Sequence, residues 1–251
     1  MRIISRLDIK NQNLIKGINL EGLRVVGEPN KYALKYYKEG VDEILFMDVV
    51  ASLYGRNNIY DIISKASKDI FIPITVGGGI RSIDDATAAF KSGADKVAVN
   101  TAAVENNDLV NQLSEKFGSQ SIVLSVEAKK IKQNYWEVFT NNGRQETGLS
   151  VMDWVKNCEK RGVGEILLTS IDMEGTRKGF DFDLFASVSN SIKIPIIASG
   201  GFGKPSDITK LNKVSEVDAV AVAYALHYNN CSISDIRKEA LKSKIRIRKL
   251  D

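Results

Sequence analysis

Residues 73–79 are Pro-Ile-Thr-Val-Gly-Gly-Gly, and residues 195–201 are Pro-Ile-Ile-Ala-Ser-Gly-Gly, an offset of 122 residues. Two further pairs keep nearly the same register. The segment Gly-Val-Asp-Glu-Ile-Leu-Phe at 40–46 recurs as Gly-Val-Gly-Glu-Ile-Leu-Leu at 162–168, and Asp-Lys-Val-Ala-Val at 95–99 recurs as Asp-Ala-Val-Ala-Val at 218–222. Self-similarity at a fixed offset indicates two halves of one architecture. We predict halves of approximately 1–119 and 120–251 within one domain, 1–251.

Short, almost continuously apolar runs alternate with amphipathic segments along the whole chain. Continuous apolar runs are typical of parallel strands that are covered on both faces. Eight such units in 251 residues fit a closed (β/α)8 TIM barrel built from two pseudo-twofold-related half-barrels, with an open doubly wound sheet as the alternative. The predicted strands are 2–7, 43–48, 72–76, 96–99, 121–126, 165–168, 194–198 and 218–222. The helical patterns include 31–38, 84–91, 108–117, 151–160 and 234–241.

Composition excludes several classes of function. The 35 basic and 31 acidic residues leave a net charge of +4, which is too small and too evenly spread to indicate a nucleic-acid partner. Apolar stretches stay far below the roughly 20 residues of a membrane span, so we expect no membrane segment. Two cysteines, Cys158 and Cys231, and no recognisable leader favour the cytoplasm. One histidine, His227, more consistent with packing than with ligation, leaves no zinc-like spacing, and we expect neither metal nor cofactor.

Acidic residues follow several of the predicted strands. Active sites of (β/α)8 barrels lie at the carboxyl ends of the strands. Asp8 and Glu127 stand in equivalent places of the two halves, so they should face each other across the barrel mouth as a general acid and a general base. Ordinary solvated carboxylates are the alternative reading. The other strand-end acids are Asp48, Asp172 and Glu174.

Glycine runs follow the third and seventh predicted strands, at 77–79 and 200–203. Glycine lets backbone N–H groups approach an anion, and a helix N-terminus adds a favourable dipole. Asn100-Thr101 and Ala223-Tyr224, after the next strand in each half, would complete two cradles. The sequence therefore predicts a ligand with two phosphates that lie far apart.

Charged residues also stand at strand starts, on the opposite face of the barrel. They are Arg2, Glu43, Lys96 and Glu165. If their side chains point inward, two cations and two anions form a salt-bridged ring that closes the barrel bottom. A solvated rim is the simpler alternative, and a gate for a small neutral molecule from a docked partner is the functional one.

These motifs resemble one known family, the cyclase subunits of imidazole-glycerol-phosphate synthase, which are ribulose-phosphate-binding barrels of histidine biosynthesis. The resemblance runs nearly end to end. It is carried by Arg6-Leu-Asp-Ile-Lys, Leu14-Ile-Lys-Gly, a loop at 23–29 (Leu-Arg-Val-Val-Gly-Glu-Pro), Asn100-Thr-Ala-Ala, Phe117-Gly-Ser-Gln and Leu168-Thr-Ser-Ile-Asp.

The resemblance implies a glutamine amidotransferase. Ammonia from a glutaminase partner would convert a phosphoribulosyl-formimino aminoimidazole carboxamide ribonucleotide into imidazole glycerol phosphate and aminoimidazole carboxamide ribonucleotide. It implies Asp8 as catalytic acid/base and Lys16 on a mobile first loop. Phosphate binding would fall to Gly79, Asn100, Thr101, Gly175, Gly201 and Ala223. The ammonia gate would be Arg2, Glu43, Lys96 and Glu165, with Asp95 facing the partner.

Four positions depart from the family pattern. Glu127 stands where the family has its second catalytic aspartate, Glu174 replaces an aspartate, and Tyr224 replaces a small hydroxyl residue. Arg6 adds a cation near Asp8 where a small residue is usual, and it would lower the pKa of Asp8 if it points into the barrel.

These departures keep other functions open. One is a paralogue that conducts ammonia for amidino-sugar or surface-glycan biosynthesis, and another is a barrel that only binds a ligand. Outside these motifs, residues 135–148 with Asn141-Asn-Gly predict a β-hairpin that could cover the site.

Overall fold

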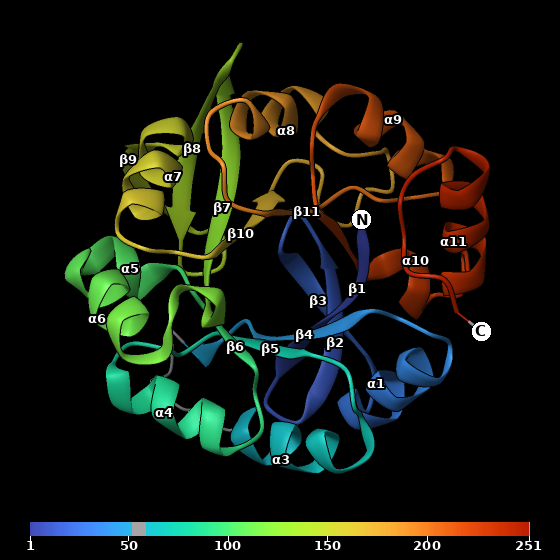
Figure 1. Ribbon diagram of the computed structural model, residues 1–251, viewed down its shortest axis with the longest axis horizontal. Coiled ribbons are helices and arrows are strands. Elements are labelled where there is room, and N and C mark those ends of the chain that lie inside the picture. Colours follow the sequence, from blue (N-terminus) through green and yellow to red (C-terminus); the bar gives the residue numbers. More distant parts are fainter. Residues whose placement is uncertain (52–58, 251) are drawn as a thin grey trace.

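The computed structural model describes residues 1–51 and 59–250, and over these residues the chain forms a closed parallel barrel (Figure 1). Eight strands pair in the order β10-β11-β12-β1-β4-β5-β6-β7, and β7 pairs with β10 to close the ring. The bounds are β1 Arg2–Lys10, β4 Glu43–Asp48, β5 Ile74–Gly77, β6 Lys96–Val99, β7 Ile122–Lys132, β10 Glu165–Ser170, β11 Ile196–Ser199 and β12 Ala219–Val222. The (β/α)8 prediction is confirmed, and the open sheet is excluded.

Helices surround the strands on the outside of the barrel (Figure 1). Local signals start several of them: Ser82, Asp181 and Ser232 each accept a backbone N–H from the first turn of the helix that follows. The helices are α1 Pro29–Lys38, α3 Ile59–Asp69, α4 Ile83–Lys91, α5 Thr101–Glu105, α6 Asp108–Phe117, α7 Val151–Lys160, α8 Phe182–Ser189, α9 Ser206–Val214, α10 Tyr224–His227 and α11 Ile233–Lys242, with a 3-10 turn at Ser119–Ser121. Over the residues described, none is long and apolar enough to cross a membrane.

Two antiparallel hairpins extend from the barrel at equivalent places. Strands β2 (Asn13–Ile18) and β3 (Glu21–Gly27) follow β1, and β8 (Tyr135–Thr140) and β9 (Gln145–Ser150) follow β7. The second hairpin confirms the prediction for 135–148. The prediction of a loop at 23–29 is wrong, because residues 21–27 form strand β3 and pair with β2. The alternation of buried apolar and exposed polar residues that marks a strand is obscured there, because the apolar side chain of Val25 is 67% exposed.

The barrel interior is arranged in layers because strand side chains alternate between its two faces. Ile4, Leu45, Val123, Leu167 and Ile197 belong to an apolar layer at mid-height. On four of these strands the residue two positions later, which points to the same face, is polar. On β1 that residue is Arg6, and Asp8 follows two positions after it on the same face. The polar layer that begins the barrel mouth consists of Arg6, Ser125, Thr169 and Ser199.

Candidate active site

A buried ionic cluster occupies one side of the barrel mouth. Arg6 Nε lies 2.8 Å from Asp8 Oδ1, and Lys16 Nζ lies 2.9 Å from Asp8 Oδ2. Lys16, brought over the mouth by β2, also pairs with Glu174 from the turn after β10. All four side chains are buried. Such a cluster is stable only because each charge has a partner of opposite sign.

The cluster fixes the charge of Asp8. Burial alone would raise the pKa of Asp8, but the Arg6 guanidinium and the Lys16 ammonium lower it well below its usual range. In return, and against the effect of burial, Asp8 and Glu174 raise the pKa of both Arg6 and Lys16. Asp8 is therefore a carboxylate throughout the neutral range, as the sequence anticipated for an inward-pointing Arg6.

Glu127, the equivalent carboxyl of the second half, lies in a different environment. It is half-buried at the wall of a cavity, and its Oε2 accepts the N–H of Gly143 over 2.8 Å. Burial raises the pKa of Glu127 to about 7, against the opposing effect of the Gly143 N–H and the Arg6 charge. A carboxyl with a pKa near 7 can both accept and release a proton at neutral pH.

The cavity beside Glu127 has a volume of about 220 Å³. Gly79, Asn100 and Thr101 line it, as the first predicted phosphate cradle requires. Asn100 Oδ1 is buried and has no hydrogen-bond partner among the residues described, so it can meet a ligand. Arg81 adds a cation to the wall. The same wall also carries the carboxyls of Asp48 and Glu105, so an anionic ligand there has to be bound by Arg81, Asn100 and backbone N–H groups, next to the titratable carboxyl of Glu127.

The second predicted cradle is built differently. A Cβ on Gly201 would lie 1.9 Å from the carbonyl oxygen of Gly179, and one on Gly175 would lie 2.4 Å from that of Gly17. Close backbone packing accounts for both glycines. Ala223 precedes α10 and is buried. Tyr224 lines a separate cavity of about 370 Å³, together with Lys16, Gly17, Arg24 and Tyr228.

Asp172 stands apart from both cavities. Its Oδ2 accepts the backbone N–H of Lys130 on β7 over 2.8 Å, which ties the turn after β10 to the neighbouring strand. Neither cavity wall includes it. Among the strand-end acids, Glu127 and Asp48 line the first cavity, while Asp8 and Glu174 belong to the ionic cluster.

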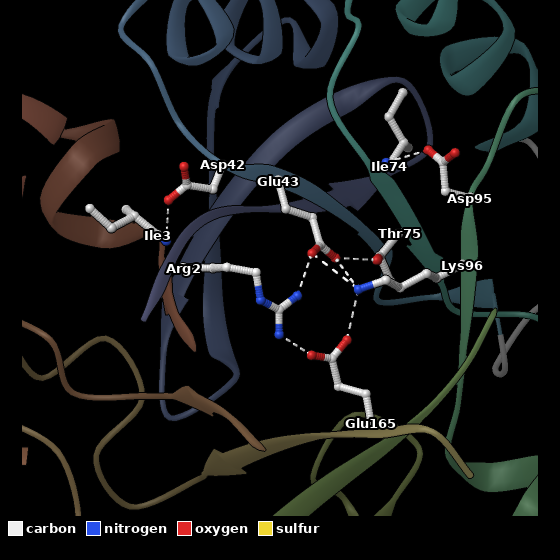
Figure 2. A network of polar contacts seen from close by, with 9 residues as sticks. All are labelled: Arg2, Ile3, Asp42, Glu43, Ile74, Thr75, Asp95, Lys96 and Glu165. Atoms are coloured by element: carbon white, nitrogen blue, oxygen red, sulfur yellow. Dashed lines mark hydrogen bonds and ion pairs between the residues drawn. The ribbon is translucent and has the colours of Figure 1, made fainter. Parts of the chain in front are cut away.

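Figure 2 shows the opposite end of the barrel, where four charged side chains form a closed ring. Arg2 pairs with Glu43 over 2.8 Å and also with Glu165, while Lys96 lies 3.2 Å from Glu43 and 2.8 Å from Glu165. Thr75 donates to Glu43 over 2.5 Å. The ring predicted from the sequence therefore forms, and the solvated rim is excluded because Glu43 and Glu165 are buried.

Asp95 lies beside this ring and is exposed. Its Oδ2 accepts the backbone N–H of Ile74 over 2.8 Å at the start of β5, and Asp218 does the same for Ile196 in the second half. The recurrence of Asp95 as Asp218 is thus explained by the pairing of adjacent strands.

Sequence reasoning missed several members of the mouth. Ser125 lines the first cavity, and Thr169 and Ser199 each accept a hydrogen bond from Arg6 over 3.0 and 3.1 Å. The sequence feature that could have identified them is a hydroxyl residue within an otherwise apolar strand. Gly143 gave no such signal, because its contact with Glu127 depends on how the β8–β9 hairpin folds over the mouth.

His227 is buried, as expected of a packed residue. Its Nδ1 lies 2.7 Å from the hydroxyl of Tyr36, and burial lowers the pKa of the imidazole to about 3. Residues 1–51 and 59–250 contain no group of three or more His, Cys, Asp or Glu side chains that could hold a metal ion. The side chains described at the mouth offer carboxyl, ammonium, guanidinium and hydroxyl groups.

Comparison with known proteins places these features in context. The chain matches the family described as histidine biosynthesis protein over residues 2–232. A protein of Legionella pneumophila named imidazole glycerol phosphate synthase subunit HisF is 60% identical over 204 residues, covering 81% of this chain and 96% of that protein. Proteins of the same name from Dehalococcoides mccartyi (strain ATCC BAA-2100 / JCM 16839 / KCTC 5957 / BAV1) and Lactococcus lactis subsp. lactis (strain IL1403) are 44% and 43% identical. Each alignment covers 97% of this chain and 95% of the relative.

Proposed function

This chain belongs to the histidine biosynthesis protein family, and we propose from its barrel mouth how it performs the cyclase reaction of imidazole glycerol phosphate synthase. It is an enzyme, the cyclase subunit of that synthase. The alternative of a paralogue that only conducts ammonia is not favoured. The similar proteins reported above are named as subunits of the synthase, and their alignments with this chain cover nearly their whole length.

The substrate is the bisphosphorylated phosphoribulosyl-formimino ribonucleotide that the resemblance implies. One phosphate binds in the cavity of Gly79, Asn100 and Thr101, where backbone N–H groups and Arg81 meet its charge. The other end of the substrate lies across the mouth. The residues we assign to that end are Lys16, Asp172, Glu174, Gly175, Gly201, Ala223 and Tyr224.

The observation that carries this proposal is the position of Glu127. A carboxyl with a pKa of about 7 lines the same cavity as the three phosphate-cradle residues. A substrate anchored there by its phosphate places its reacting carbon and nitrogen atoms near a group able to exchange protons. Asp8, on the first strand of the barrel, stays a carboxylate between Arg6 and Lys16 and holds Lys16 over the mouth.

Ammonia comes from a glutaminase subunit that docks on the opposite face of the barrel. The support is the ring of Arg2, Glu43, Lys96 and Glu165, which closes the barrel interior on that side, and the exposed carboxylate of Asp95 beside it. An apolar layer separates this ring from the mouth and suits passage of a small neutral molecule. Cys158 and Cys231 are unpaired, as expected of the cytoplasmic enzyme we propose, because a reducing compartment keeps thiols free.

Turnover driven by ammonium salt tests the proposal on the isolated chain. The purified protein should convert the phosphoribulosyl-formimino substrate at about pH 8.5, where a fraction of ammonium is free ammonia. Glu127→Gln should reduce kcat/KM by at least about 100-fold. Glu115→Gln, on the outer helix α6, is the matched control and should leave the rate unchanged. A folded wild-type protein without turnover would refute the proposed reaction.

A further inference from the structure

Arg6 lies inside the barrel at the base of the mouth, and its guanidinium reaches three strands. Nε donates to Asp8 on its own strand β1, and one terminal nitrogen donates to Thr169 on β10 and Ser199 on β11. The side chain is 3% exposed. No cavity described above includes Arg6 in its wall, so its charge acts on the mouth through its neighbours.

Both oxygens of Asp8 are engaged by this arrangement. Oδ1 faces Arg6 and Oδ2 faces Lys16, and the carboxylate lines neither cavity. A group that is to take a proton from a substrate must come within hydrogen-bond reach of it. Asp8 is withdrawn from that reach by its two cations.

Glu127 differs from Asp8 both in its hydrogen-bond partners and in its position at a cavity wall. It lines the first cavity together with Ser125 and Asn100, and its hydrogen-bond partners are the backbone N–H of Gly143 and the side-chain amide of Asn100. Both of these partners are uncharged, whereas both partners of Asp8 are cations. The two halves of the barrel hold equivalent acids in inequivalent settings.

We propose that Arg6 is a positioning residue that fixes Asp8 as a permanent carboxylate and so leaves Glu127 as the member of this pair that exchanges protons with substrate. The inference rests on the proposed function and deepens it, because it assigns different roles to the two acids. The proton that Glu127 accepts in one step is the proton it releases in a later one, so the carboxylate is regenerated in each cycle.

The charges that face Glu127 set how it responds to a change at Arg6. Arg6 and Asp8 act from β1, and the remaining charged residues of the cavity wall act from the end of β4, the turn after β5 and helix α5. These are Asp48, Arg81 and Glu105. The positive charge of Arg6 lowers the pKa of Glu127, and the negative charge of Asp8 raises it. Removing the Arg6 cation leaves the charge of Asp8 less compensated, so the pKa of Glu127 rises.

The pH profile of turnover tests this assignment. With free ammonia held constant, kcat/KM of the wild type should change with a midpoint of about 7. Arg6→Met, which keeps an unbranched apolar side chain but removes the charged guanidinium, should move that midpoint upward by about 1 pH unit. Arg6→Lys should restore it, and Arg161→Met on the barrel exterior is the matched control with no shift. An active Arg6→Met enzyme with an unmoved midpoint would overturn the inference while leaving the cyclase function intact.

A second measurement does not depend on activity. Carboxyl carbon NMR of protein labelled at Asp and Glu, with Asp8→Asn and Glu127→Gln to assign the two signals, follows each proton directly. In the wild type the Asp8 signal should stay constant from about pH 5 to 9 while the Glu127 signal titrates near 7. An Asp8 signal that titrates above about pH 5 would refute the role of Arg6, even if the Arg6→Met variant fails to fold.

Discussion

The backbone N–H of Gly143 donates to Glu127 Oε2 over 2.8 Å, so the tip of the β8–β9 hairpin holds a carboxyl at the barrel mouth. The same turn contacts the other hairpin, because Asn142 donates to the carbonyl of Leu20 over 3.3 Å. Leu20, Phe139 and Ile171 form a small apolar cluster beneath this contact. The two hairpins thus meet over the mouth and couple its two halves.

Gly143→Ala should weaken both this contact and turnover. Gly143 has φ of 73°, and a Cβ there would lie 2.9 Å from Leu20 Cδ1. We expect a loss of about 1 kcal/mol in the free energy of unfolding and of roughly tenfold in kcat/KM, since Glu127 would shift. Gly148→Ala is the matched control, with φ of 72° and open space around it. Equal turnover of the two variants would contradict the role of Gly143.

Glu127→Gln should change how stability depends on pH. Because burial raises the pKa of Glu127 to about 7, the folded state favours the protonated form, and its contribution to stability is lost as pH rises from about 4.5 through 7. Glutamine resembles the protonated acid and cannot ionise. At about pH 8.5 the variant should therefore be more stable than the wild type by about 2 kcal/mol, a value reduced for partial exposure. Urea unfolding at several pH values checks this, and parallel curves for the two proteins would contradict it.

Asp8→Asn should destabilise the protein at neutral pH. The change leaves Arg6 and Lys16 buried with one fewer anion, and breaking such a pair costs about 3–5 kcal/mol. Because the pKa of Asp8 is lowered on folding, its contribution is present above the usual Asp value and is lost as pH falls.

The double variant with Arg6→Met completes the test of this pair. It should lose less stability than the sum of the two single variants, since the unpaired cation is gone. Additive losses would mean that the two side chains are not coupled.

Glu43→Gln should be costly for the same reason at the other end of the barrel. Glu43 is 1% exposed and meets Arg2, Lys96 and Thr75, so we expect a loss of about 3 kcal/mol in the free energy of unfolding. Glu28→Gln is the matched control, because its pair with Lys31 is exposed to solvent and should contribute nothing measurable. Thermal unfolding of both variants decides the matter, and equal melting temperatures would contradict a buried ring.

His227 should stay neutral over the whole range in which the enzyme works. Burial lowers its pKa to about 3, and it is the single histidine of the chain, so its imidazole NMR signals are unambiguous. Those signals should be constant between about pH 5 and 9. The unfolded chain binds this proton at about pH 6.5, so His227 also lowers stability as pH falls below that value. A titration midpoint above about pH 5.5 would contradict this environment.

Much of the fold could be predicted from the pattern of apolar and polar residues along the sequence. Continuous apolar runs located the eight barrel strands, with bounds identical for Glu43–Asp48 and Lys96–Val99 and short by three residues at the end of β1. The offset of 122 residues predicted two equivalent halves, and alternation places Ile4, Arg6 and Asp8 on one face of β1. These properties follow from side-chain polarity along a few residues of one segment, which is why a sequence alone reveals them.

The contacts that define the candidate site came from closure of the barrel. Arg6 meets Thr169 across 163 positions of sequence, Lys16 meets Glu174 across 158, and Gly143 reaches Glu127 because a hairpin folds over the mouth. Sequence placed Asp8 and Glu127 in equivalent positions. Only the tertiary structure decided that one is held between two cations and the other lines a cavity, because a pKa depends on burial and on charges that other strands bring within a few ångströms.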